Sequence, residues 1–225
     1  MALLVFVFKV PPENHFVKNE VTTVNVLLEN GFGTGNFINN EKFPYILTCK
    51  HVTDNIITEL GIGTSKDKEF SKAKLVVVSK TKDFSIIEIN KIHVGYKIAK
   101  YEEFDSTILG DKIYYYGLPG KAGFPFLSLG VSAQKDIPSG NYMYNAGSFS
   151  CHGGSSGATI FNSKGLGVGI LCKSNLEFNR GTYGLYLKIE DIRKSLRSLE
   201  LTSGLLDGKC NVKLSEMHKG PIEVE

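Results

Sequence analysis

The sequence lacks the features that mark several large classes of protein. The apolar stretch that opens the chain, residues 1–8, is far shorter than the roughly 20 residues that a membrane-spanning helix requires. It has no basic n-region and no small-residue cleavage site, so we expect a strand ended by Pro11 and Pro12, and not a signal peptide. Charge is nearly balanced, with 26 Lys and Arg against 23 Asp and Glu. We therefore expect neither a membrane partner nor a nucleic-acid partner, which would need a basic patch.

Cysteine is scarce, and its spacing argues against the common zinc sites. The paired C-x-x-C spacing of structural zinc sites is absent, so we expect no metal and no cofactor. Two of the cysteines, Cys49 and Cys172, fall within apparent strands, where a free thiol behaves as a small apolar side chain. This placement favours a reduced, cytoplasmic protein, whereas the number of cysteines would also allow disulfides of unknown connectivity. The four are Cys49, Cys151, Cys172 and Cys210.

Two serines stand among glycines immediately before a short strand-like run, in residues 151–161. Glycine and serine clusters are usually loops, but a serine framed in this way is also a candidate nucleophile. An unassisted hydroxyl reacts poorly and needs a neighbouring base that is oriented by a third group. Ser155 and Ser156 therefore gain a catalytic meaning only if the rest of the chain supplies these partners.

Both partners occur upstream, each at the edge of a predicted strand. His51 follows residues 43–50, whose β-branched and aromatic side chains predict a strand ending at the histidine. Asp83 opens the isoleucine-rich run 84–89, which predicts a buried strand. Taken singly, such a histidine is usually structural, and such an aspartate is usually a turn residue. Together with Ser156 they give the order His, Asp, Ser, which is the order of the triad on chymotrypsin-type β-barrels.

A second pattern in the same segment points to a different enzyme. Residues 153–157 match the G-x-S-x-G turn of α/β-hydrolases, in which Ser155 would be the nucleophile of an esterase. That fold places its acid and its histidine downstream of the serine, and only His218 lies downstream, in a polar segment. The chain is also rich in predicted strands without long helices alternating between them. We therefore prefer Ser156 and keep the Ser155 esterase as an alternative.

These motifs, in this order, resemble the trypsin-like serine peptidases of the chymotrypsin fold, and more closely their HtrA-type bacterial and small viral branches. The resemblance covers most of the chain, and its histidine and serine motifs, 46–52 and 154–157, are the most specific. It implies an all-β fold of two six-stranded antiparallel β-barrels with a C-terminal helix. Looser matches are residues 31–38 and 83–87 in the first barrel, and 108–120, 129–132, 165–172 and 184–189 in the second.

The same resemblance implies a division of the chain into two lobes. Residues 1–100 would form the first barrel, which carries the histidine and the aspartate. Residues 101–203 would form the second, which carries the serine and the specificity pocket. The isoleucine and leucine spacing of residues 190–199 predicts an amphipathic helix that closes the second barrel. Residues 204–225 turn polar and predict a loose C-terminal tail.

The resemblance also assigns a role to each residue of the site. His51 would act as general base and then as general acid, Asp83 would orient it, and Ser156 would attack the substrate carbonyl. The backbone amides of Gly154 and Ser156 would form the oxyanion hole. The protein would thus be a serine endopeptidase that hydrolyses proteins or peptides through an acyl-enzyme intermediate.

The expected substrate pocket is uncharged. The family match places Ser150 at its floor and Leu171, Ser174 and Gly184 on its walls. A floor without a carboxylate offers no counter-charge to arginine or lysine. Viral relatives that cleave after glutamine or glutamate usually have a histidine where this chain has Leu171. We therefore expect an uncharged or apolar side chain before the scissile bond.

The residue before the predicted nucleophile departs from the pattern of the secreted members of the family. Secreted members pair a freed N-terminus with an aspartate just before the nucleophile, but Ser155 occupies that position, so we expect activity without N-terminal cleavage. A catalytically silent, peptide-binding barrel would have the same fold. The resemblance leaves the source open between a bacterial enzyme and a viral protease that processes a polyprotein in the host cytoplasm.

Overall fold

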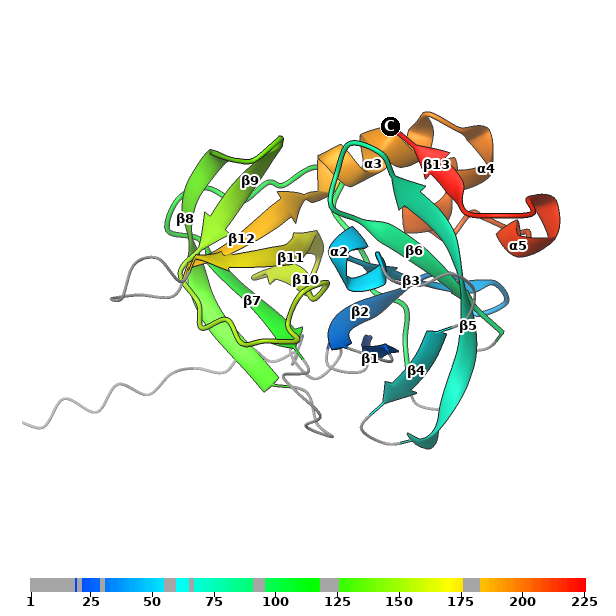
Figure 1. Ribbon diagram of the computed structural model, residues 1–225. Coiled ribbons are helices and arrows are strands. Elements are labelled where there is room, and N and C mark those ends of the chain that lie inside the picture. The colour runs from blue at the N-terminus through cyan, green and yellow to red at the C-terminus, as the bar shows by residue number, and fades with distance from the viewer. Residues whose placement is uncertain are drawn as a thin grey trace, which may run out of the picture.

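Short runs of β-branched and aromatic residues form the strands of two β-barrels that lie side by side in the computed structural model (Figure 1). The structure describes residues 19, 22–28, 31–54, 60–64, 67–90, 96–117, 126–175 and 183–225. The strand predicted at the start of the chain lies outside these residues. The all-β fold of two six-stranded barrels that the sequence predicts is confirmed.

The first barrel is a ring of antiparallel strands in the order β5-β4-β1-β2-β3-β6, closed by pairing between β5 and β6. Every residue of β3 and β6 is buried, so adjacent apolar side chains such as Ile46 and Leu47, or Ile86 and Ile87, occur in them without alternation. The strands are β1 (Thr23–Leu28), β2 (Gly31–Asn39), β3 (Pro44–Thr48), β4 (Leu60–Thr64), β5 (Asp67–Ser79) and β6 (Ser85–Ile89).

The second barrel closes in the order β10-β11-β12-β9-β8-β7. Aromatic side chains fill much of one of its core clusters, in which Tyr115, Phe149 and Tyr186 are all buried. The strands are β7 (Lys112–Gly117), β8 (Phe126–Ser139), β9 (Tyr142–Gly147), β10 (Thr159–Asn162), β11 (Gly167–Asn175) and β12 (Tyr183–Lys188).

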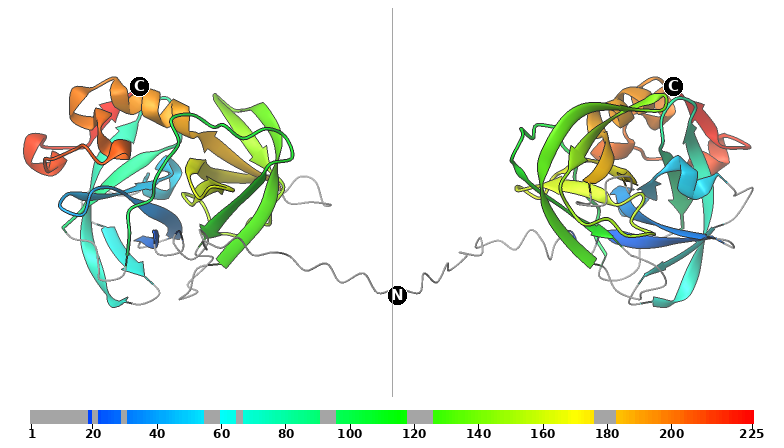
Figure 2. Two further views of the ribbon diagram at one scale, coloured as in Figure 1. Left: turned by 180° about the vertical axis from the view of Figure 1, so that it is seen from behind. Right: turned by 60° about the vertical axis from the view of Figure 1, so that its left-hand side comes forward.

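The C-terminal region beyond the helix α3 (Ile189–Arg197) is folded against the first barrel. The predicted helix is present as α3, but the expectation of a loose tail beyond it is wrong. Strand β13 (Ile222–Val224) pairs with β5 in parallel and buries its two apolar side chains, and Figure 2 shows this red end of the chain on the first-barrel side of the molecule. The remaining short helices are α4 (Glu200–Ser203), η1 (Leu205–Asp207) and α5 (Leu214–Met217). Across the described ranges, no helix is long and apolar enough to cross a membrane.

Asp105 lies in the segment that connects the two barrels, and its side chain anchors this segment to the second barrel. Its side chain is 1% exposed. One carboxylate oxygen accepts hydrogen bonds from Lys135 Nζ at 2.8 Å, Asn145 Nδ2 at 2.6 Å and Tyr186 OH at 3.0 Å. The other accepts from Thr107 Oγ1 at 2.6 Å. Burial alone would raise the pKa of Asp105, but the interactions with Lys135 and Thr107 outweigh it and hold the pKa below its usual value.

We expect Asp105→Asn to lower the free energy of unfolding by about 2 kcal/mol at about pH 7, because an amide leaves the Lys135 ammonium without its counter-charge. A carboxyl whose pKa falls on folding stabilises the fold above its unfolded pKa, and this stabilisation is lost as the pH falls through the folded value. The difference between variant and wild type should therefore shrink at about pH 3. Urea unfolding at both pH values measures this difference in the free energy of unfolding. The control is Asp111→Asn, which replaces an exposed carboxylate. Equal stabilities at neutral pH would contradict the expectation.

Candidate active site

His51 and Asp83 are brought together on the first barrel. The strand β3 ends at Thr48, and His51 lies in the one-turn helix α2 (Lys50–Thr53), so the prediction that the strand continues to the histidine is wrong. Val52 is buried in this helix, which turns the chain back onto the barrel and leaves the His51 side chain 43% exposed. Asp83 stands just before β6, as the sequence predicts.

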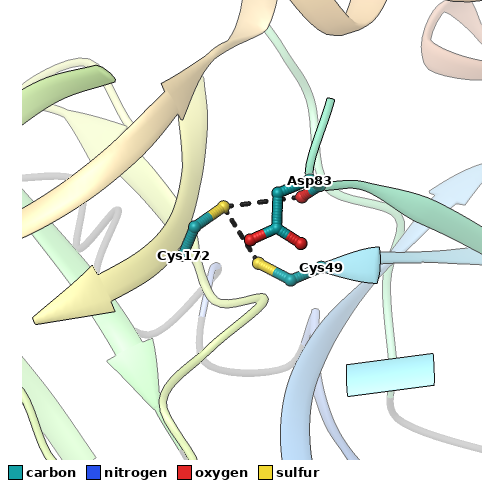
Figure 3. Close-up of side chains that lie close together, drawn as sticks. All are labelled: Cys49, Asp83 and Cys172. Carbon is teal, nitrogen blue, oxygen red and sulfur yellow. Dashed lines mark hydrogen bonds between the residues drawn. The ribbon is translucent and has the colours of Figure 1, made fainter. Parts of the chain in front are cut away.

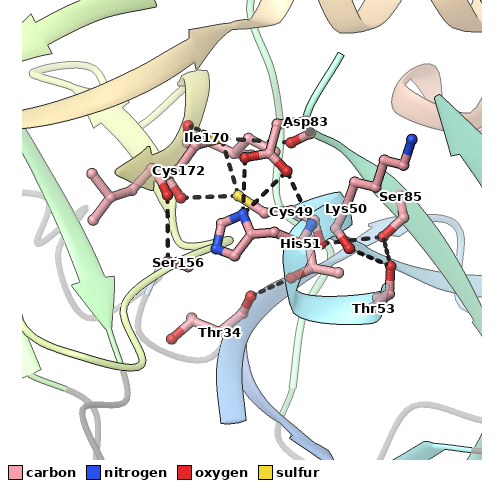
Figure 4. Close-up of polar contacts among 12 residues, drawn as sticks. Thr34, Cys49, Lys50, His51, Thr53, Asp83, Ser85, Ser156, Ile170 and Cys172 are labelled. Carbon is pink, nitrogen blue, oxygen red and sulfur yellow. Dashed lines mark hydrogen bonds and ion pairs between the residues drawn. The ribbon is translucent and has the colours of Figure 1, made fainter. Parts of the chain in front are cut away.

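The carboxylate of Asp83 holds His51 through three contacts (Figure 4). Nδ1 of His51 lies 2.8 Å from Oδ2 and 3.1 Å from Oδ1, and the backbone N–H of His51 donates to Oδ1 at 3.0 Å. Burial alone would raise the pKa of Asp83, but the hydrogen bonds and charge of His51 outweigh it and hold the pKa below its usual value. The carboxylate therefore stays ionised and fixes the orientation of the imidazole.

Ser156 reaches the same place from the second barrel, on the loop that precedes β10. Two successive turns shape this loop, closed by hydrogen bonds from Ser155 N to His152 O and from Ala158 N to Ser155 O. The third residue of each turn is a glycine with positive φ, 95° at Gly154 and 92° at Gly157, as type II turns require.

The hydroxyl of Ser156 faces the site without a short hydrogen bond. Oγ lies 3.5 Å from the backbone carbonyl of Cys172, and no hydrogen bond to His51 is present among the residues that the structure describes. In Figure 4 the His51 ring turns one nitrogen toward Asp83, and Ser156 lies on the other side of the ring. The three predicted residues therefore converge from two barrels on one place.

Ser155, the alternative nucleophile, is buried beneath the loop. It is 2% exposed, and its Oγ lies 3.5 Å from the hydroxyl of Tyr115, which itself donates to the carbonyl of Ser150 at 2.5 Å. The downstream histidine, His218, is exposed and bonds locally through Nδ1 to the Gly220 carbonyl. Because the fold is all-β and these two residues do not meet, the α/β-hydrolase alternative is wrong.

Thr34 on β2 contacts the serine loop, and it belongs to none of the candidate site residues predicted from the sequence. Its backbone N–H donates to the carbonyl of Ser156 at 2.8 Å. The signal in the sequence is the glycine on each side of it, because glycine within a strand often marks a close approach of another backbone. A Cβ placed on Gly33 would lie 2.6 Å from Val52 and 3.2 Å from the Ser156 carbonyl oxygen.

The predicted pocket residues lie near one another on the second barrel. Ser174 on β11 pairs with Gly184 on β12, and Ser174 is exposed. The carbonyl of Ser150 is held by the Tyr115 and Ser128 hydroxyls. A Cβ on Gly184 would meet Phe149, Cys151 and Leu171 at 2.2, 2.7 and 2.8 Å. The surroundings of Gly184 are thus tight and apolar, without a carboxylate among these neighbours.

Cys49, Asp83 and Cys172 form a buried cluster (Figure 3), in which Asp83 is the residue that contacts His51. The two sulfur atoms are 3.0 Å apart, whereas two thiolates on one tetrahedral zinc, each at about 2.3 Å, are separated by about 3.8 Å. Burial raises the pKa of both thiols, and the carboxylate is already bonded to His51. The donor set therefore does not fit a zinc ion, and all four cysteines of the chain are free thiols.

Comparison with known proteins identifies the family. Residues 33–170, more than half of the chain, match the trypsin-like peptidase domain, so the chain belongs to this family. No curated protein sequence matches it. Among solved structures, the fold is similar to the crystal structure of Deg5, with a TM-score of 0.64 and 18% sequence identity over 83% of this chain and 92% of the Deg5 chain.

The protein is accordingly a trypsin-like serine endopeptidase, and the family and enzyme class predicted from the sequence are confirmed. The expected likeness to the HtrA-type branch holds at the level of the fold. Its substrates are proteins or peptides, as the family implies.

Proposed function

We propose that His51, Asp83 and Ser156 are the catalytic triad of this peptidase and that it cleaves peptide bonds through an acyl-enzyme intermediate. The observation that carries the proposal is the 2.8 Å contact of His51 Nδ1 with the buried Asp83 carboxylate, next to a serine presented by the other barrel. A base held by an acid beside a hydroxyl is the arrangement that activates a serine.

In this mechanism Ser156 Oγ attacks the carbonyl carbon of the scissile bond while Nε2 of His51 takes the hydroxyl proton. The tetrahedral intermediate then collapses, the C–N bond breaks, and His51 returns the proton to the leaving amine. Water repeats the same steps on the acyl-enzyme and releases the carboxylic acid. Rotation about the Cα–Cβ bond of Ser156 would move Oγ from the Cys172 carbonyl toward His51, and such contacts commonly tighten when substrate binds.

The oxyanion of the intermediate is stabilised by the backbone amides of Gly154 and Ser156. The positive φ of Gly154 supports this role, because it orients the loop in a conformation that glycine adopts without strain. Losing one such donor costs about 10²- to 10³-fold in kcat in related chemistry.

The substrate side chain before the scissile bond is uncharged or apolar in this proposal. It is supported by the absence of a carboxylate among Ser150, Leu171, Ser174 and Gly184, and by Phe149 and Cys151 beside Gly184. The four free thiols support a reducing, cytoplasmic setting.

An active-site fluorophosphonate tests the nucleophile and the base together. We expect covalent labelling at Ser156, located by mass spectrometry of the digested protein, and a labelling rate about 10³-fold lower in His51→Ala, which has lost its general base. Ser155→Ala is the matched control and should label as the wild type does, because Ser155 is buried and its Oγ contacts Tyr115. A folded wild-type chain that remains unlabelled would instead indicate a catalytically silent barrel.

A further inference from the structure

Thr34 connects the first barrel to both residues that are proposed to bind the oxyanion. It is fully buried on β2. Its Oγ1 donates a 2.7 Å hydrogen bond to the carbonyl of Gly154, and its backbone N–H donates to the carbonyl of Ser156 at 2.8 Å. Its own carbonyl accepts from Thr48 Oγ1 at 2.7 Å, which ties it to the next strand. One residue of the first barrel thus holds two backbone carbonyls of the serine loop, which belongs to the second barrel.

The two backbones are in direct contact at this point. A Cβ on Gly157 would lie 1.9 Å from the Thr34 carbonyl oxygen and 2.3 Å from Thr48 Oγ1. The loop therefore cannot move closer to β2. The hydrogen bonds from Thr34 oppose the opposite movement, away from β2, because breaking them would leave the donors of a fully buried residue without these partners.

We propose that Thr34 is a positioning residue for the oxyanion hole, which its hydroxyl keeps in the donating conformation by fixing the Gly154 carbonyl. The inference rests on the proposed function, because that function assigns the oxyanion donors. Thr34 would act through the two loop carbonyls that it holds, and not on the reacting atoms themselves. Donors stabilise a transition state in proportion to how well they are held in place beforehand, so a loosened Gly154 amide lowers the rate of the chemical step.

Thr34→Val tests this inference, because it replaces the hydroxyl by a methyl group of similar size. We expect kcat for a peptide substrate to fall about tenfold and KM to change by less than about twofold, since the lost interaction acts on the transition state. The affinity of a peptide aldehyde should fall by about the same factor as kcat, because its hemiacetal oxygen would occupy the oxyanion hole. Thr34→Ser, which retains the hydroxyl, should restore most of the loss.

Thr202→Val is the matched control for stability. Thr202 is also fully buried, and its Oγ1 donates to the Leu196 carbonyl at 2.6 Å, in the C-terminal helices. Its substitution should lower the thermal midpoint much as Thr34→Val does while kcat stays unchanged. If Thr34→Val does not fold, comparison of Thr34→Ser with Thr34→Ala isolates the hydroxyl.

Two outcomes separate this inference from the function on which it rests. An active wild type with unchanged kcat and aldehyde affinity in Thr34→Val overturns the positioning role alone. A folded wild type that neither cleaves peptides nor reacts with the fluorophosphonate overturns the proposed triad, whatever the Thr34 variants do.

Discussion

Ser156→Ala is expected to lower kcat for peptide hydrolysis by at least about 10⁴-fold, because the methyl group cannot form the acyl-enzyme. The fold should be retained. The hydroxyl is only partly buried and makes one long contact, at 3.5 Å to the Cys172 carbonyl, so its removal should change the free energy of unfolding by less than about 0.5 kcal/mol. Steady-state kinetics and thermal unfolding of the same preparation measure both quantities.

Ser155→Ala gives the matched comparison, since the two serines are adjacent but point to different surroundings. Ser155 Oγ is buried near Tyr115, so its loss should be visible in stability and should leave turnover in place. If instead Ser156→Ala retained activity and Ser155→Ala lost it, the assignment of the nucleophile would be wrong.

Asp83→Asn is expected to lower kcat by about 10⁴-fold with little change in KM. The amide can still accept one hydrogen bond from the His51 backbone, but it would present an NH₂ group to Nδ1. The imidazole would then carry its proton on Nε2 and could not take the proton of Ser156. The same contact with His51 stabilises the charged form of Asp83 and, against the effect of burial, holds its pKa below the usual value. Progress curves at saturating and at low substrate separate kcat from KM.

Asp54→Asn removes an equal charge close to the same histidine and serves as the control. Asp54 is exposed at the end of α2, so its substitution changes the local field without touching the ring. We expect near wild-type kinetics from it. Comparable losses in the two variants would mean that Asp83 acts through general electrostatics and not by orienting His51.

Local patterns predicted the strands well where they are bounded by turn residues and buried on one or both faces. The isoleucine run after Asp83 is such a case, and the isoleucine and leucine spacing predicted the helix α3 equally well. The end of β3 was misplaced, because Cys49 leaves the strand and a single helical turn follows, which burial of Val52 stabilises. The C-terminal strand β13 was missed because three residues carry too little pattern, and its pairing with β5 depends on the finished barrel.

The sequence by itself determined the order of His51, Asp83 and Ser156, the glycines that shape the serine loop, and the all-β class, because backbone preference and apolar periodicity are local properties. Only the tertiary structure decided that Asp83 bonds to His51, that Ser155 is buried, and that Thr34 holds a loop 120 residues away. The first two depend on how each barrel closes, and the contact of Thr34 depends on how the two barrels pack together. Directed hydrogen bonds between distant residues have no periodic signature in the chain, so they appear only once the fold has brought the groups within 3 Å.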